Sequence, residues 1–203
     1  MKRSNYVVVG LSVFFLLITF LLETRLITNF DIAIYNLVTT NMNDFWTGFN
    51  RVFTFLGSTE FIVSVCVILF GVFFYLKRRN ISYLVVGSLA ISTTVNNIVK
   101  LIVRRERPTV LELVEEGTFS YPSGHTMCAT SLYLLLVYLV IKSNISKRLK
   151  IVLSIILSII PILVAISRIY LGAHFASDVI AAIILAIILL IVEVNLLVKK
   201  KWL

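Results

Sequence analysis

The sequence has few charged residues and few residues that interrupt helices. Only 14% of its 203 residues are charged, 59% are hydrophobic, and there are 3 prolines and 8 glycines. A soluble domain carries about 25% charged and about 45–50% apolar residues. This composition excludes an ordinary soluble enzyme and a disordered chain, and it indicates a polytopic membrane protein.

Cysteine is also scarce. The 2 cysteines, Cys66 and Cys128, lie inside apolar runs and form no C-x-x-C pair. They therefore predict neither a disulfide framework nor a cysteine metal site. A net charge of +9 would suggest nucleic acid in a soluble chain. Here the basic residues flank apolar runs, so we expect no nucleic-acid partner and attribute the charge to membrane topology.

Six uncharged runs predict six membrane-spanning helices, because a helix needs about 20 residues to cross the hydrocarbon. The second run is short, so we expect that span to begin near Gly57 or Ser58. The predicted fold class is all-α, a bundle of six transmembrane helices forming a single membrane domain over residues 1–203. The runs cover residues 4–22, 61–76, 80–99, 117–141, 151–167 and 179–192, the last extending to about 198.

The basic residues predict the orientation of the bundle. With six spans and a cytoplasmic N-terminus, 12 of the 19 Lys and Arg residues fall in cytoplasmic segments and 7 on the other side. The cytoplasmic clusters are short and dense, as the positive-inside rule requires. We therefore expect a multi-pass protein of the cell membrane with both termini in the cytoplasm.

The connection over residues 23–60 predicts two short helices after the first span. Asp31 is a candidate cap for the first helix, and Asp44 for a second that ends at Gly57. The aromatic residues of the second helix suit either a position at the headgroup level or packing over the bundle.

Polar residues otherwise gather in three clusters, over residues 96–108, 121–125 and 167–178. Ionisable groups at membrane depth are costly, so each cluster is a candidate functional site. Both histidines of the chain, His125 and His174, belong to these clusters. Alternation of six spans places all three clusters on the same side of the membrane, outside.

The chemistry of the clusters suits a phosphate group. Ser123 is a good helix cap and Gly124 allows close approach to a helix N-terminus, which binds anions. His174 and Asp178 are four residues apart and would share a helical face, so the carboxylate can orient the imidazole. Three cations, Lys100, Arg107 and Arg168, complete a pocket for a tetrahedral dianion.

The remaining charged residues have simpler interpretations. Arg104 and Arg105 are interpreted as cations that reach the membrane interface. Glu193 is interpreted as an interfacial carboxylate. The loop residues Glu112, Glu115 and Glu116 are interpreted as solvated.

Three motifs in this order resemble the signatures of the type 2 phosphatidic acid phosphatase (PAP2) superfamily. The resemblance implies a metal-independent hydrolase of phosphomonoesters or diphosphates, without a cofactor. The motifs lie within residues 100–178 and read Lys100-x6-Arg107-Pro108, Pro122-Ser123-Gly124-His125 and Ser167-Arg168-x5-His174-x3-Asp178.

The resemblance also implies a role for each motif residue. His174 would attack phosphorus and form a phosphohistidine, and Asp178 would orient it. His125 would protonate the leaving oxygen and later activate water. Binding of the phosphoryl oxygens would fall to Lys100, Arg107, Ser123, Gly124 and Arg168. No metal ligands are predicted.

The compact chain resembles bacterial members that act on envelope lipids at the outer leaflet. The expected partners are a lipid phosphate substrate and the surrounding membrane lipids. Phosphatidylglycerol phosphate, undecaprenyl diphosphate and phosphatidic acid remain open as substrates, and the oligomeric state is open as well. The alternative is a transporter or flippase that binds lipid phosphate without hydrolysis, but translocation needs cations and not a pair of histidines.

Overall fold

The computed structural model describes residues 2–109, 113–114 and 117–199, and within these residues all regular secondary structure is helical. This agrees with the predicted all-α fold class. The helices are α1 (Lys2–Leu21), α2 (Arg25–Thr39), α3 (Asp44–Leu56), α4 (Thr59–Tyr75), α5 (Arg79–Val103), α6 (Gly124–Lys142), α7 (Lys147–Tyr170) and α8 (Ala176–Lys199).

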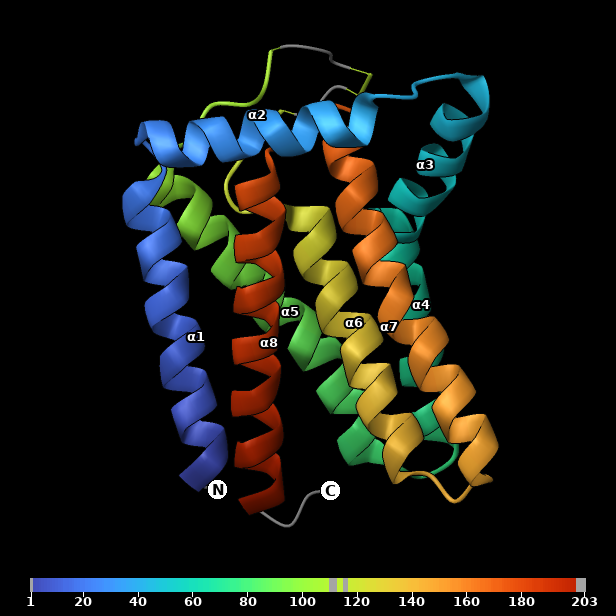
Figure 1. Ribbon diagram of the computed structural model, residues 1–203. Coiled ribbons are helices and arrows are strands. Elements are labelled where there is room, and N and C mark those ends of the chain that lie inside the picture. Colours follow the sequence, from blue (N-terminus) through green and yellow to red (C-terminus); the bar gives the residue numbers. More distant parts are fainter. Residues whose placement is uncertain (1, 110–112, 115–116, 200–203) are drawn as a thin grey trace.

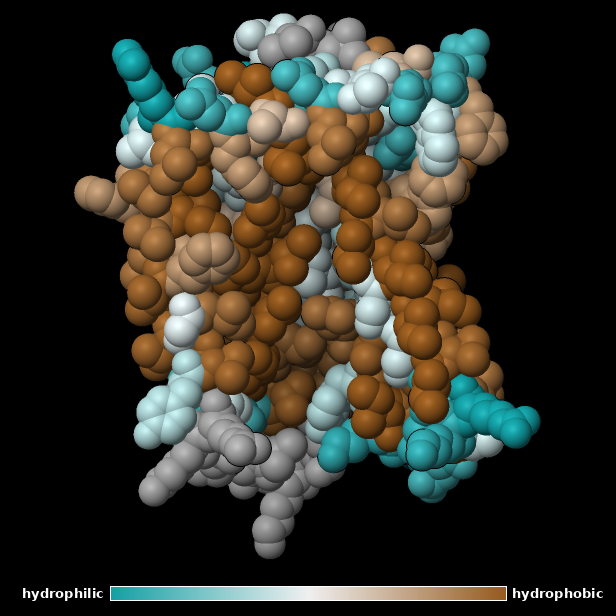
Figure 2. All heavy atoms as spheres, in the orientation of Figure 1, coloured by the Kyte–Doolittle hydropathy of each residue, from teal (hydrophilic) through white to brown (hydrophobic). Residues whose placement is uncertain are grey.

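The helices account for the predicted spans. In the described residues, α1, α5, α6, α7 and α8 are each long and apolar enough to cross a membrane, and α3 with α4 qualifies as a pair bent by 44°. Counting the bent pair as one span gives six. A broad apolar belt separates the two polar ends of the molecule (Figure 2), as expected for a chain whose helices face lipid.

Capping residues set the helix boundaries. Ser58 accepts a hydrogen bond from the Phe61 amide at 3.2 Å, so α4 begins where the sequence indicated. Ser123 caps α6 in the same way through the Thr126 amide, at 3.4 Å. The fourth span therefore begins at Gly124 and not at residue 117, and the preceding uncharged residues form a loop that leads to the cap.

Helix α6 lies in the middle of the bundle and packs against α4, α5, α7 and α8. The main core joins four of these helices through Ile62, Val85, Leu135 and Val164. Helix α1 packs against α8 on one flank. The first turn of α1 and the last turn of α8 lie at the same end of the bundle (Figure 1).

The two short helices predicted after the first span are present, with different caps. Helix α2 runs across the end of the bundle, at a steep angle to the spans (Figure 1). Asp31 does not cap it, because α2 begins at Arg25 and Asp31 lies buried within it. The cap of α3 is Asn43 and not Asp44, since the Asn43 side chain accepts from the Trp46 amide at 3.0 Å.

Gly57 lets the bend between α3 and α4 approach α7 closely. A Cβ atom at this position would lie 2.5 Å from Cγ1 of Val164 and 3.4 Å from the carbonyl oxygen of His125. Any larger residue would therefore push the bend away from α6 and α7.

The interpretation of Glu193 as an interfacial carboxylate stays a prediction. Glu193 is buried in α8 and lines a cavity that also includes Ser88 of α5. The loop residues Glu112, Glu115 and Glu116 lie outside the described residues.

Candidate active site

One cavity of about 340 Å³ brings together five of the residues singled out in the sequence. Its walls come from α4, α5, the start of α6 and the α7–α8 turn. The five residues are Lys100, Arg107, Gly124, His125 and His174. A neighbouring cavity of about 800 Å³ shares Asn97, Lys100, Arg107 and Thr118 with it, so the site continues into the loop after α5.

The α7–α8 turn positions His174. Gly172 has φ of 73°, a left-handed conformation that favours glycine, and it reverses the chain after α7. The amides of Ala173 and His174 then donate to the carbonyl oxygen of Arg168, at 3.1 and 3.2 Å. His174 therefore precedes α8 instead of lying on a helical face with Asp178, as its spacing had suggested.

Asp178 nevertheless reaches His174 from the first turn of α8. Its Oδ2 atom accepts from the Phe175 amide at 2.9 Å and lies 3.6 Å from Nδ1 of His174. The Ser120 hydroxyl donates to the same Oδ2 at 2.5 Å and lies 3.3 Å from His174 Nδ1. Both acceptors face one ring nitrogen, so this arrangement favours a proton on Nδ1.

The other ring nitrogen, Nε2, lies 3.3 Å from a guanidinium nitrogen of Arg107. A guanidinium can only donate, so this contact is favourable only when Nε2 carries a lone pair. Arg107 is itself fixed by the carbonyl oxygens of Thr118 and Ala173, each at 2.7 Å. The geometry thus holds a ring nitrogen that can carry a lone pair next to a cation inside the cavity.

Burial lowers the pKa of His174 to about 4, although Asp178 acts in the opposite direction. The charges of Arg168 and Arg107 contribute to this lowering of the pKa. The imidazole is therefore neutral near pH 7, and only the neutral form has a lone pair to offer.

The first motif approaches the site from the end of α5. Lys100 is buried and its ammonium donates to the carbonyl oxygen of Phe119. One turn earlier, Asn96 donates to the carbonyl oxygen of Pro122 at 3.3 Å, which ties α5 to the loop before α6. These two bonds hold the cation of α5 against the N-terminus of α6.

Ser123, Arg168 and Asp178 surround the cavity without being part of its wall. Ser123 is fully buried as the α6 cap, and its amide donates to the carbonyl oxygen of Asp178 at 3.3 Å. Arg168 is 2% exposed and donates to the Thr54 hydroxyl of α3 at 2.7 Å. The structure therefore gives Ser123 and Asp178 supporting positions behind the cavity wall, and it puts the charge of Arg168 near His174.

The interpretation of Arg105 as an interface cation is wrong. Its side chain is 12% exposed, and its guanidinium contacts Asp178 Oδ1 at 2.6 Å and Asp31 Oδ2 at 2.8 Å and lies 4.0 Å from the Phe175 ring centre. Asp31 also accepts from the amide and the hydroxyl of Ser177, each at 2.8 Å. Arg105 thus links α2 to the start of α8 and holds the carboxylate that faces His174.

Arg104, the neighbour of Arg105, has different surroundings, and its position at the membrane interface stays a prediction. It is exposed, ends α5 in a left-handed conformation with φ of 53°, and among the described residues its side chain bonds only to the carbonyl oxygen of Leu101. Sequence reasoning missed Asp31, Ser120 and Ser177 as well as Arg105. The only local signal was that Asp31 interrupts an apolar helix.

Possible metal ligands do not cluster in the described residues. Within the described ranges, no three side chains of His, Cys, Asp or Glu come together as a metal would require. The two cysteines, Cys66 and Cys128, form no disulfide with each other. Cys66 is buried in the core between α4 and its neighbours.

Comparison with known proteins identifies the family to which the chain belongs. The PAP2 superfamily matches residues 81–202. The chain is 34% identical to phosphatidylglycerophosphatase B of Bacillus subtilis (strain 168) over 183 residues, which cover 86% of each protein.

Two solved structures share the fold. The crystal structure of the first transmembrane PAP2-type phosphatidylglycerolphosphate phosphatase, from Bacillus subtilis, superposes with a TM-score of 0.88 at 31% identity, covering 96% of this chain and 97% of that one. Aquifex aeolicus LpxE superposes with a TM-score of 0.60 at 20% identity, covering 81% and 94%. The bundle, the motifs and these relatives agree, so the chain belongs to the PAP2 superfamily and is an integral-membrane phosphatase.

Proposed function

We propose that this protein hydrolyses the phosphomonoester of phosphatidylglycerol phosphate through a phosphohistidine on His174. The observation that carries the proposal is the pairing of His174 Nε2 with Arg107 at 3.3 Å inside a cavity that also contains His125 and Lys100. A phosphoryl group seated there would meet the nucleophile, a candidate proton donor and two cations at once.

In the first step, the Nε2 lone pair attacks phosphorus while the bond to the lipid oxygen breaks. His125 donates a proton to the departing alkoxide, and Asp178 with Ser120 stabilises the charge on the His174 ring through Nδ1. In the second step, His125 takes a proton from water as the water oxygen attacks phosphorus. Inorganic phosphate leaves and His174 regains its lone pair.

The cations act on the transferring group. Negative charge builds on the phosphoryl oxygens in each transition state, and Lys100, Arg107 and Arg168 are assigned to stabilise it. The N-terminus of α6, with Ser123 and Gly124, adds the dipole of a long helix. These groups supply positive charge without a metal ion, which supports a metal-independent reaction.

A lipid can reach this cavity from the side. Its wall includes Val63 of α4 and Thr93 and Asn97 of α5, all three exposed on the surface of the bundle. We assign this opening to the glycerol and acyl chains, and the adjoining 800 Å³ cavity beside Glu106 and Thr109 to the remainder of the headgroup.

Phosphatidylglycerol phosphate is favoured over the other lipid phosphates by the two Bacillus subtilis relatives, whose names state that activity. The orientation is proposed from the charge split, with both termini in the cytoplasm and the cavity facing outside. Three of the 7 basic residues on the cavity side, Lys100, Arg107 and Arg168, belong to the motifs. The remaining four are fewer than the 12 of the cytoplasmic segments, so they do not oppose this orientation.

A substrate panel tests the proposal. The purified full chain in detergent is given phosphatidylglycerol phosphate, phosphatidic acid or undecaprenyl diphosphate, and released phosphate is measured with the His174→Ala variant as the blank. We expect the highest kcat/KM for phosphatidylglycerol phosphate. A higher kcat/KM for undecaprenyl diphosphate would overturn the substrate assignment and leave the phosphatase activity standing.

A further inference from the structure

A second large cavity lies at the end of the bundle opposite to the candidate active site. It has a volume of about 650 Å³, within the range of small-molecule sites. It is bounded by the end of α4, the α4–α5 link, the start of α5 and the end of α6. Along α6, its residue Lys142 is about 25 Å from His125, because a helix rises about 1.5 Å per residue.

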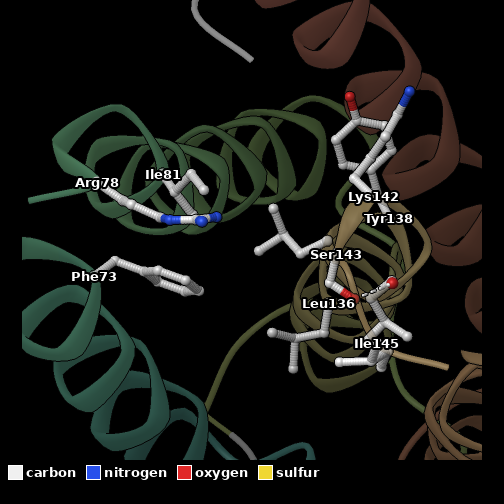
Figure 3. A pocket seen from close by; sticks show the side chains of 10 residues that line it. Phe73, Arg78, Ile81, Leu136, Tyr138, Lys142, Ser143 and Ile145 are labelled. Carbon is white, nitrogen blue, oxygen red and sulfur yellow. Dashed lines mark hydrogen bonds between the residues drawn. The ribbon is translucent and has the colours of Figure 1, made fainter. Parts of the chain in front are cut away.

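The walls of this cavity combine two cations with apolar side chains. Arg78 extends from the α4–α5 link into the space between Phe73 and Ile81 on one side and Leu136 of α6 on the other (Figure 3). Lys142 stands on the α6 side, 5.8 Å from the ring centre of Tyr138. A lipid headgroup with its first acyl carbons needs this same combination of charged and apolar contacts.

The backbone holds Arg78 in place. Lys77 takes a left-handed conformation with φ of 59°, and the Arg78 amide donates to the carbonyl oxygen of Phe73 at 2.8 Å. Arg78 is also the N-cap residue of the 25-residue helix α5 and makes no side-chain capping bond. The positive end of that helix dipole therefore adds to the charge at the cavity.

The charge of this region is uncompensated. The α4–α5 and α6–α7 links together with the adjoining helix ends, residues 77–79 and 142–150, carry seven basic residues and no acidic one. Within the part of the chain that the structure describes, neither Arg78 nor Lys142 has a carboxylate in salt-bridge contact. An orientation signal requires cations near the membrane but does not require that two of them share one cavity.

We propose that this cavity binds the headgroup of an anionic phosphodiester phospholipid in the leaflet opposite to the one that the candidate active site faces. Arg78 and Lys142 pair with the phosphate, as basic pockets between transmembrane helices do with anionic headgroups. The Ser143 hydroxyl, Phe73 and Leu136 contact the glycerol and the first acyl carbons. The bound lipid has no phosphomonoester, so it is a ligand and not a substrate.

Native mass spectrometry of the full chain in detergent, titrated with cardiolipin, measures this binding. We expect cardiolipin to bind the wild type more tightly than phosphatidylcholine does. The Arg78→Gln/Lys142→Gln double variant should bind cardiolipin about thirtyfold more weakly, the ratio expected for loss of two cations at the membrane surface. Its hydrolysis of p-nitrophenyl phosphate should remain at the wild-type rate, which shows that it is folded.

A charge-matched control is the Lys147→Gln/Arg148→Gln double variant, because both residues are exposed at the same end and neither lines the cavity. We expect its cardiolipin affinity to stay within about threefold of wild type. The Leu136→Trp variant keeps every charge but fills the cavity, and it should bind as weakly as the first double variant.

Three results would overturn the proposal. Equal losses in the two double variants would indicate a diffuse surface charge. Wild-type affinity in Leu136→Trp would show that the lipid does not enter the cavity. A loss confined to a Lys100→Gln/Arg107→Gln variant would place the bound cardiolipin at the other end of the bundle.

Discussion

The two ends of the helical bundle hold their positive charges in different ways. At the motif end, Arg168 is almost fully buried and Arg105 is largely buried, and each donates hydrogen bonds to side chains of other helices. At the opposite end, Arg78, Lys142 and Arg148 are exposed at helix termini. When a buried cation is removed, its partners stay buried without a charge partner, because water cannot reach them. An exposed cation contributes little to stability and mainly sets the orientation of the protein in the membrane and attracts anions. Substitutions at the two ends should therefore differ in kind and size.

The largest expected effect is at the two histidines of the motif end. His174→Ala should reduce turnover of every substrate to background, because the proposed covalent intermediate forms on this residue. His125→Ala should lose about 10²–10⁴-fold on a lipid phosphate, whose alkoxide needs a proton, and much less on p-nitrophenyl phosphate. Steady-state rates of both variants on both substrates measure this. Equal losses of His125→Ala on the two substrates would contradict its assignment as the proton donor.

Matched cations at the two ends give the next largest difference. Arg107→Gln should lower kcat by roughly 10²–10³-fold, the usual cost of one positioned donor to developing charge. Arg148→Gln, at the opposite end, should change kcat by less than about twofold. Lys100→Gln and Arg168→Gln are expected to resemble Arg107→Gln. If all four variants lost activity alike, the site would depend on overall charge and not on positioned groups.

Arg105 and Arg104 allow the same comparison between neighbouring residues. Arg105→Gln leaves Asp31 and Asp178 buried without their cation, so we expect a loss of about 3 kcal/mol in the free energy of unfolding and a marked fall in kcat. Arg104→Gln, which removes only a local bond, should cost less than about 0.5 kcal/mol. Thermal unfolding in detergent together with kcat separates the two. Equal stability of both variants would show that the ion pairs with Asp31 and Asp178 do not stabilise the fold.

The smallest expected effect concerns pH. Burial lowers the pKa of His174 to about 4, so between about pH 6.5 and pH 4 the unfolded chain binds a proton at this residue that the native state does not. Native stability from this residue is therefore complete above pH 6.5 and declines as the pH falls, by at most about 1.4 kcal/mol per pH unit. The fall in Tm from pH 7 to pH 5 should be shallower in His174→Gln than in wild type or Arg148→Gln. Parallel slopes in all three would contradict a neutral, buried His174.

Local patterns in the sequence were sufficient to predict much of the fold. Apolar runs and charged ends predicted the spans. Each helix in a membrane must form all its backbone hydrogen bonds internally and present an apolar surface to lipid. Ser58 and Ser123 gave the starts of α4 and α6, because capping depends on residues within one turn. The predicted start of the fourth span, residue 117, is too early. A run without charges does not reveal that its first residues form a loop.

The candidate site was predictable to the extent that it lies in short motifs. The motif residues Lys100, Arg107, Gly124, His125 and His174 share one cavity, as their placement at successive helix ends had indicated. Their chemical roles remain predictions. Asp31, Arg105 and Ser177 were missed because their contacts join residues 72–146 positions apart, and no local pattern encodes such pairing. The path of α2 across the bundle, which delivers Asp31, is likewise a tertiary feature.

The central claim is that His174 becomes phosphorylated during turnover. The most direct measurement uses His125→Ala, in which loss of the group that activates water should make the intermediate accumulate. The variant is incubated with p-nitrophenyl phosphate, quenched in alkaline detergent to preserve a phosphorus–nitrogen bond, digested and mapped by mass spectrometry. We predict phosphate on the peptide that contains His174, and none in a His125→Ala/His174→Ala double variant. Phosphate on any other residue, or phosphate found in that double variant, would contradict the assignment of His174 as the nucleophile.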